Sequence, residues 1–176
     1  MILTRREIAQ LLKKKIVSNP RTEPAIDSIS ITLHLGNQFA YYEPPTTEAF
    51  VPPMEMPLTY DTIERPEDGY ILLPNSTVLA ASEELITMPL NLMGLMQTRS
   101  SLARGFLMIH PSAGHIEPGY KGALTFELVN LSKFHYKLVP GMPIAKLFLM
   151  QLASEVPQEH GYNGRYQNAK GPIGMK

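Results

Sequence analysis

The stretch TRSSLARGFLMIHPSAGHIEPGYKGALTFE, residues 98–127, carries the clearest structural and chemical signals of the chain. Its second half contains Glu117–Gly122, with one proline and two glycines at a point where the chain must reverse. An apolar run of strand-forming residues follows directly at 123–129. The stretch therefore predicts a strand that begins just after a tight turn, which is typical of antiparallel β-structure.

Glu127 lies inside this predicted strand. Because alternate residues of a strand point to opposite faces, Glu127 shares a face with Thr125, whereas Phe126 points to the other, core-directed face. A carboxylate at such a position is paired with a cation, kept neutral by burial, or exposed to solvent. The strand alone favours an ordinary solvent-facing residue, and the neighbouring motifs favour a functional one.

The first half of the stretch is rich in groups that bind anions. Arg99 and Arg104 bracket Ser100 and Ser101. Two guanidinium groups beside two short hydroxyl donors suit a polyphosphate or an anionic intermediate better than a buried core. We therefore expect this segment to contact an anionic ligand.

The rest of the chain predicts a mainly β protein with an N-terminal α-helix. Thr4 and Glu7 form a capping-box pattern, and apolar residues at helical spacing follow, which predicts a helix over 4–15. A strand is expected at 29–35, before a proline-rich connection over 42–66. Further short strands are expected, with the spacing of an antiparallel sandwich or barrel, at 70–73, 77–81, 92–97, 106–110, 123–129, 134–139 and 144–150.

Composition limits the function classes. The 176 residues suffice for one domain, and the balance of 16 basic and 16 acidic residues gives no reason to expect binding to nucleic acid or to a membrane surface. The absence of cysteine excludes disulfides and thiolate metal sites, so the pair His115 and Glu117, which resembles half of a zinc deaminase motif, predicts no zinc site. The other histidines lack metal-ligand spacing, and no apolar run is long enough to span a membrane, so we expect a cytoplasmic protein.

A series of ordered motifs resembles the active-site sequence of the dCTP deaminases, which belong to the dUTPase-like trimeric superfamily. The resemblance implies a distorted antiparallel β-barrel or jelly roll and a homotrimer with shared active sites. It also implies a single domain over 1–176, with 158–176 as a flexible C-terminal lid. The matching segments cover most of the chain and are 31–37, 99–104, 112–114, 116–120, 125–127, 140–144 and 162–171.

The resemblance also implies a chemistry, the zinc-independent hydrolysis of dCTP to dUTP and ammonia, with Mg²⁺ carried by the triphosphate. Glu127 is the expected general base for the water that attacks C4 of the ring, a proton transfer worth roughly 10²–10⁴-fold in rate. Ser100 and Arg104 are expected to hold that water and stabilise the intermediate from a neighbouring subunit. The expected nucleotide contacts are Arg99, Ser101, Ala113, Glu117, Thr125, Phe126, Tyr162 and Arg165.

Five positions differ from the usual pattern of the family. Thr32 and Glu117 each replace an aspartate, Thr98 replaces a glycine, and Lys146 and Ala169 each replace a glutamine. Two alternatives therefore stay open. One is a dUTP diphosphatase, alone or combined with deamination to give dUMP, as the pair Ala113–Gly114 suggests. The other is a nucleotide-binding relative without catalysis.

Overall fold

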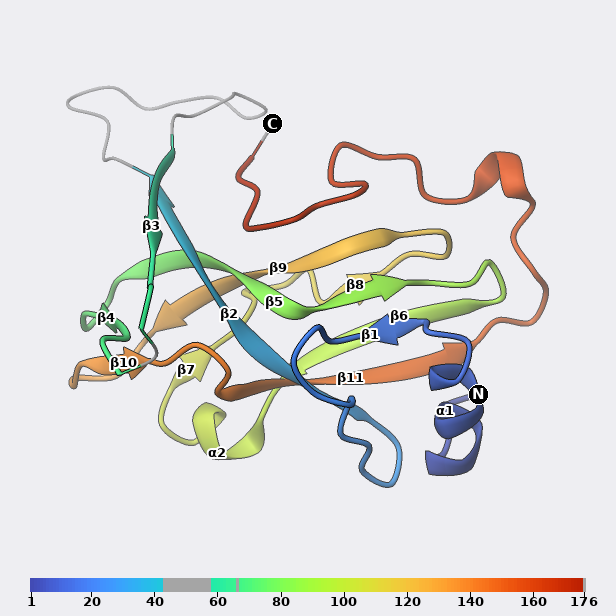
Figure 1. Cartoon of the computed structure of the whole chain (residues 1–176), viewed down its shortest axis with the longest axis horizontal. Helices are drawn as coiled ribbons and strands as arrows, with labels where there is room; N and C mark the ends of the chain where they lie inside the picture. Colours follow the sequence, from blue (N-terminus) through green and yellow to red (C-terminus); the bar gives the residue numbers. More distant parts are fainter. Residues whose placement is uncertain (43–57, 66, 176) are drawn as a thin grey trace.

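The computed structural model describes residues 1–42, 58–65 and 67–175, and within them the chain is mainly antiparallel β-structure with a short N-terminal helix (Figure 1). The expected fold class is confirmed. The helices are α1 (Arg5–Leu12), α2 (Ser100–Ala103) and the 3₁₀ turn η1 (Gln158–His160), and the strands are β1 (Val17–Ser18), β2 (Ile31–Tyr42), β3 (Leu58–Thr62), β4 (Tyr70–Leu72), β5 (Thr77–Thr87), β6 (Leu92–Thr98), β7 (Leu107–Met108), β8 (His115–Ile116), β9 (Lys121–Asn130), β10 (Tyr136–Leu138) and β11 (Pro143–Gln151).

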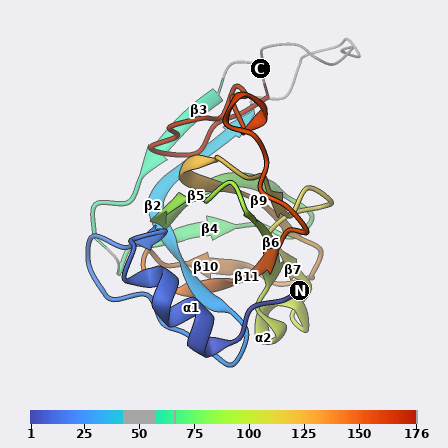
Figure 2. The same cartoon turned by 90° about the vertical axis from the view of Figure 1, so that its right-hand side faces the viewer.

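Within the described ranges, nine strands form one sheet in the order β7-β9-β5-β2-β11-β6-β8, with β1 paired to β5 and β3 paired to β2. Strands β4 and β10 form a separate ribbon. Neighbouring strands pair antiparallel, and the sheet curls around its own interior, as the turned view in Figure 2 shows. Strand β9 lies between β7 and β5, so its position is fixed on both edges.

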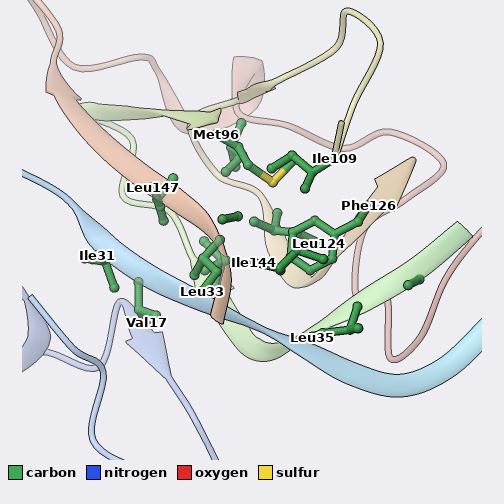
Figure 3. Packing of buried hydrophobic residues seen from close by; sticks show 14 of the residues in the cluster. Val17, Ile31, Leu33, Leu35, Met96, Ile109, Leu124, Phe126, Ile144 and Leu147 are labelled. Atoms are coloured by element: carbon green, nitrogen blue, oxygen red, sulfur yellow. The ribbon is translucent and has the colours of Figure 1, made fainter. Parts of the chain in front are cut away.

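The interior of the curled sheet is filled by alternate apolar side chains of the long strands (Figure 3). Leu33 of β2, Phe126 of β9 and Leu147 of β11 are completely buried there. The ring of Phe39 stacks on Tyr70 with centroids 4.7 Å apart, which attaches the β4 ribbon to the main sheet. This core fixes which face of β9 points inward.

The N-terminal helix ends earlier than predicted. Its start is as expected, because the backbone N–H of Thr4 donates a 2.9 Å hydrogen bond to the Glu7 carboxylate in a capping box. The helix stops at Leu12, and Lys15 has a left-handed backbone with φ of 56°. The reversal there carries Val17 into β1, where its side chain is buried.

Strand β5 extends well beyond its predicted range of 77–81. The extension contains a glutamate that is buried, although a charged residue is usually expected at the surface. Glu84 is 0% exposed, and its carboxylate accepts hydrogen bonds from the backbone N–H of His34 and the side-chain amide of Asn19, both at 2.9 Å. The His34 ring nitrogen Nδ1 lies 2.7 Å from the same carboxylate. These partners are distant in sequence, so the local pattern ends the predicted strand too early.

Other predicted elements appear with altered bounds. The strand expected at 29–35 continues as β2 to Tyr42, the strand expected at 106–110 shrinks to β7, and β1, β3 and β8 were not expected. Most of the proline-rich connection predicted for 42–66 lies outside the described residues. In the part of the chain that the structure describes, no helix has the length and apolar character needed to cross a bilayer.

The core assignment gives a prediction for stability. Leu33→Ala should lower the free energy of unfolding by about 2–5 kcal/mol, because it removes buried contacts and leaves a cavity. Leu85→Ala, at a position that is 47% exposed in β5, is the matched control and should cost about 1 kcal/mol or less. Urea unfolding at one fixed protein concentration measures both. Equal losses in the two variants would contradict the assigned core.

Candidate active site

A cavity of about 670 Å³ opens beside the non-core face of β9. This volume lies in the range of pockets that enclose small ligands. Its walls come from strands β2, β5, β6 and β9, the segment 111–117 and the C-terminal tail. Five of the residues predicted to act on the nucleotide line it, namely Ala113, Glu117, Thr125, Glu127 and Tyr162.

Glu127 is half-buried in the wall of this cavity. Its backbone N–H donates a 2.8 Å hydrogen bond to the carbonyl of Ile109, and it pairs in register with Leu79 of β5. Burial raises the pKa of the Glu127 carboxyl above its ordinary value, and the charge of His110 acts in the opposite direction with a smaller effect. Glu127 thus lies on the non-core face of β9, as the alternation predicts, and its side chain faces a cavity; its role stays a prediction. A carboxylate in this environment suits proton transfer.

Phe126 occupies the opposite face of the same strand. Its side chain is 0% exposed and belongs to the core, as the alternation along β9 predicts. The expected contact between Phe126 and the nucleotide therefore does not apply to its side chain. Only its backbone lies near the cavity, between Thr125 and Glu127.

The predicted turn before β9 is confirmed. Next to this turn, two tyrosines pack together and line one end of the cavity. Gly119 has φ of 87°, and a Cβ there would lie 2.9 Å from the backbone nitrogen of Tyr162. Tyr162 donates its backbone N–H to Pro118 at 2.8 Å and packs edge-on against Tyr120 with ring centroids 5.5 Å apart. Burial, with a smaller contribution from Tyr162, raises the pKa of Tyr120 to about 12, so this phenol stays neutral.

The C-terminal tail lies across the cavity. Ala169 forms a parallel bridge with Gly122, and its carbonyl accepts the backbone N–H of Ala123 at 2.8 Å. Further along, the backbone N–H of Ile173 donates to the Thr125 hydroxyl at 3.2 Å. The tail is thus in the position expected of a lid, and its movement stays a prediction. Ala169 holds the tail on β9 through its backbone, and this contact does not need the glutamine side chain expected at this position.

The predicted cationic residues lie elsewhere in the same chain. Ser100, Ser101 and Arg104 are exposed on or beside α2, and Arg99 precedes it and donates to the carbonyl of Pro143 at 3.3 Å. Both Figure 1 and Figure 2 place α2 on the opposite side of the molecule from the C-terminal tail. Lysine and arginine do not occur among the described residues that line the cavity, and the predicted contact Arg165 lies in the tail just outside that lining. One copy of the chain therefore holds the acidic part of the predicted site without the cationic part.

Two of the unusual residues form a single unit. Lys146 of β11 pairs in register with Thr32 of β2, and its ammonium group donates to the Thr32 hydroxyl at 2.8 Å and to the Asp27 carboxylate. The hydrogen bond from Lys146 is the largest of the effects that lower the pKa of Asp27. An ammonium group and a hydroxyl thus stand where the family pattern has an amide and a carboxylate.

The described residues offer no built site for a divalent cation. No group of three His, Cys, Asp or Glu side chains in the described part of the chain is arranged to hold a metal ion, and Asp27 already binds Lys146. The residues therefore do not fit a protein-held magnesium ion. The expectation that Mg²⁺ accompanies the triphosphate as part of the substrate stays a prediction.

Several cavity residues were missed at the sequence level. Tyr42, Leu79, Met96 and the tail segment 173–175 line the cavity but belong to no chemical motif. The pairing of β2, β5 and β9 brings the first two there. Among the scattered histidines, His110 alone lies near the motif in the sequence, and the pattern assigns it no role.

Comparison with known proteins agrees with this geometry. A family model described as dCTP deaminase-like matches residues 2–152. The dUMP-forming dCTP deaminase of Acidothermus cellulolyticus is 34% identical over 177 residues, covering 98% of this chain and 93% of that protein. The enzyme of the same name from Dictyoglomus thermophilum is 32% identical over 183 residues, covering 100% of this chain and 94% of that protein.

Solved structures support the fold. The 2'-deoxycytidine 5'-triphosphate deaminase of Agrobacterium tumefaciens superposes with a TM-score of 0.66 at 16% identity, over 90% of this chain. The match spans 50% of that solved chain, about half its length. The native EIAV dUTPase superposes with a TM-score of 0.53 at 19% identity, over 84% of this chain and 97% of its own. At these identities the likeness concerns the architecture alone.

The docking of the tail gives a testable consequence. Gly122 has φ of 136°, and a Cβ at this position would lie 2.6 Å from the backbone nitrogen of Ala169. Gly122→Ala should therefore push the tail from β9, and the amides of Ala123 and Asn168, which bond across this contact, should exchange with solvent faster. Hydrogen–deuterium exchange measures the effect.

The matched control is Gly141→Ala. Gly141 also has a positive φ, 83°, but the nearest atom to its added Cβ lies 3.8 Å away. This variant also places alanine at a positive φ, without the close approach to the tail, and should leave exchange in the tail unchanged. Parental exchange at Ala123 and Asn168 in Gly122→Ala would contradict the proposed role of this close approach.

Proposed function

The chain belongs to the dCTP deaminase-like family, and on this basis we propose that it is a bifunctional hydrolase that converts dCTP to dUMP. The observation that carries the proposal is the half-buried Glu127 in a cavity of ligand size. The dUMP-forming relatives favour this reaction over release of dUTP, which the sequence analysis placed first. The pair Ala113–Gly114 points the same way.

Deamination follows from the position of Glu127. The carboxylate takes a proton from a water molecule whose oxygen bonds to C4 of the cytosine. That proton passes to the ring nitrogen N3 as the C4=N3 double bond becomes a single bond. The carboxylate then takes the proton of the new C4 hydroxyl and passes it to the exocyclic nitrogen, the C4–N bond breaks, and ammonia leaves as C4 becomes the uracil carbonyl. The burial that raises the pKa of Glu127 assists the removal of the proton from water, because the carboxylate becomes a stronger base.

A second carboxylate is available for the phosphate reaction. Glu117 lines the same cavity, is exposed, and has a carboxylate oxygen 3.9 Å from Nε2 of His115. We assign it to orient a water molecule that attacks the α-phosphorus of the deaminated nucleotide. The bond between the α-phosphorus and the bridging oxygen breaks, and dUMP and pyrophosphate leave.

The cationic part of the site is assigned to a neighbouring subunit of a homotrimer. A triphosphate needs positive groups, and the described lining of the cavity contains neither lysine nor arginine. Ser100 and Arg104 are exposed on α2, where they are free to enter the cavity of another copy. The separation of these groups within one chain supports a shared site.

An apolar surface beside α2 supports the same assembly. Phe106, Leu131 and Phe134 are 63%, 54% and 54% exposed. They are connected, because the Leu131 N–H donates to the Phe106 carbonyl at 3.0 Å and Phe134 packs on Tyr136, whose hydroxyl donates to Gly105 at 2.7 Å. Exposed apolar groups that lie together mark an interaction surface. This surface would bring α2 against the neighbouring copy.

Two carboxylate variants test the assigned reactions. Glu127→Gln should lower ammonia release from dCTP by roughly 10²–10⁴-fold or more, because the amide cannot accept the proton. Glu117→Gln is the matched variant and should stop pyrophosphate release while ammonia release continues. Ammonia and pyrophosphate are assayed separately with dCTP and with dUTP, and nucleotide affinity is measured as well. These measurements distinguish the loss of one reaction from the loss of the other.

Each outcome of these assays has a defined meaning. Ammonia release at the parental rate in Glu127→Gln would refute its role as the base. Release of ammonia without pyrophosphate by the parental protein would indicate that it deaminates dCTP to dUTP and does not catalyse the phosphate reaction. Nucleotide binding without any product would identify a non-catalytic relative.

Mixed assemblies test the shared site. Glu127→Gln and Arg104→Ala subunits, each inactive alone, should together recover about a quarter of the parental activity when trimers form at random from equal amounts. A hybrid then holds one site with both native residues. Co-refolding followed by ammonia assay measures the recovery, with each variant refolded alone as control. Absence of recovery in confirmed hybrids would place both residues in one chain's site.

A further inference from the structure

Lys146 is a charged residue in the middle of the main sheet. Its neighbours along β11, Ala145 and Leu147, are 0% exposed and belong to the core, so alternation places Lys146 on the outer face. Across the sheet, Lys146 pairs in register with Thr32 of β2 and with Gln97 of β6. The side chains of these two residues therefore leave the sheet on the same outer face.

The ammonium group of Lys146 is fixed but not saturated. It donates one hydrogen to the Asp27 carboxylate and one to the Thr32 hydroxyl, the second at 2.8 Å. An ammonium group carries three hydrogens, and the third has no partner in the part of the chain that the structure describes. The side chains of Lys146 and Asp27 are 23% and 53% exposed. A positively charged donor is thus held in place with access to solvent.

A second cation is attached to the same strand. The backbone N–H of Arg99 donates to the carbonyl of Ile144 at 3.1 Å, and its guanidinium group donates to the carbonyl of Pro143 at 3.3 Å. The hydrogen bond from Lys146 is the main cause that lowers the pKa of Asp27, and the charge of Arg99 adds a smaller effect. Two cations therefore act on a single exposed carboxylate.

The group continues into α2, which begins directly after Arg99. This segment adds three exposed residues with hydrogen-bond donors, namely Ser100, Ser101 and Arg104. Together with Lys146 and Arg99 they form a cluster that contains three cations and only one carboxylate, that of Asp27. Ammonium and guanidinium groups beside hydroxyl donors suit phosphate oxygens.

We propose that Lys146 binds the phosphates of the nucleotide in the cavity of a neighbouring copy, and that its ammonium group supplies there the positive charge that a protein-held metal ion would otherwise supply. The proposal rests on the proposed shared site and its triphosphate substrate. The described residues contain no group of three His, Cys, Asp or Glu side chains arranged to hold a metal ion, and the carboxylate at this place, Asp27, binds Lys146. A fixed ammonium group compensates phosphate charge directly.

The pair of Lys146 and Asp27 also has a purely structural interpretation, because it attaches the segment before β2 to the sheet. The two partners separate the interpretations. Loss of either partner breaks a structural pair and should affect nucleotide binding in the same direction. If Lys146 binds phosphate, loss of its charge weakens binding, whereas loss of the Asp27 charge frees the ammonium group and removes a repulsion.

Lys146→Gln is the main test and should weaken dCTP binding by roughly tenfold or more in buffer with EDTA, because a charge-assisted contact is lost. The loss should be smaller with Mg²⁺, which restores positive charge, and smaller for dCMP, which has fewer phosphate groups. Asp27→Asn should bind dCTP at least as tightly as the parent, and Lys146→Arg should keep most of the affinity. Calorimetry measures binding in a Glu127→Gln background, so that dCTP is not deaminated.

Two further variants serve as controls. Lys14→Gln, at an exposed lysine just after α1, removes the same charge elsewhere and should leave dCTP affinity unchanged. Lys146→Met is the second variant in case Lys146→Gln disturbs folding, and size-exclusion chromatography checks that each variant keeps the parental assembly.

Inorganic tripolyphosphate separates this proposal from the function on which it rests, because its binding needs neither cytosine nor a reaction. Its affinity should fall in Lys146→Gln as that of dCTP does. Unchanged affinity for both probes in correctly assembled Lys146→Gln, or an equal loss in Lys146→Gln and Asp27→Asn, would overturn the proposal. A parent that releases no ammonia would refute the proposed deamination, while tripolyphosphate binding still decides the role of Lys146.

Discussion

The pairing of β9 with β5 and with the end of β7 is the constraint on which the site depends. The register Leu79 to Glu127 and the bond from the Glu127 amide to Ile109 fix the strand on both edges. A shift by one residue would exchange the two faces, sending Phe126 to the cavity and Glu127 to the core. Burial of Phe126 therefore positions the carboxylate, and the same apolar packing that stabilises the sheet selects the reactive face.

The carboxylates of this molecule differ in how they are paired. Glu84 is fully buried and receives hydrogen bonds from Asn19 and His34, and Lys146 binds Asp27 and Thr32. Such paired charges are stable and chemically quiet. Glu127 has only the distant compensation of His110 against the effect of burial. This difference in pairing is consistent with the role as a base that we propose for Glu127.

The sequence predicts the strands whose apolar alternation is local and misses what depends on distant partners. Residues 123–129 and 92–97 match β9 and β6 closely, because turn residues bound them. The predicted range for β5 is too short, because the local sequence shows a charged Glu84 and does not show its hydrogen-bond partners Asn19 and His34. Sequence motifs predicted the presence of Glu127 and Glu117 in the site. Tyr42 and the segment 173–175 belong to no motif and line the cavity only because the fold brings them there. The family resemblance predicted that Phe126 contacts the nucleotide, whereas the alternation of side chains along the strand already predicted that it points into the core.

The tail occupies groups that the proposed nucleotide site would also use. The Thr125 hydroxyl accepts the Ile173 amide, and the Tyr42 hydroxyl accepts the Met175 amide at 2.6 Å, so part of the wall is already in use. Each such bond contributes only about 0.5–1.5 kcal/mol net, which a charged ligand held by several guanidinium groups can exceed. We therefore expect a bound triphosphate to displace the end of the tail and to leave the bridge at Ala169, which is anchored separately on β9. The tail is thus held at two separate places, at Ala169 on β9 and at the hydroxyls of Thr125 and Tyr42, and its closure over a nucleotide stays a prediction.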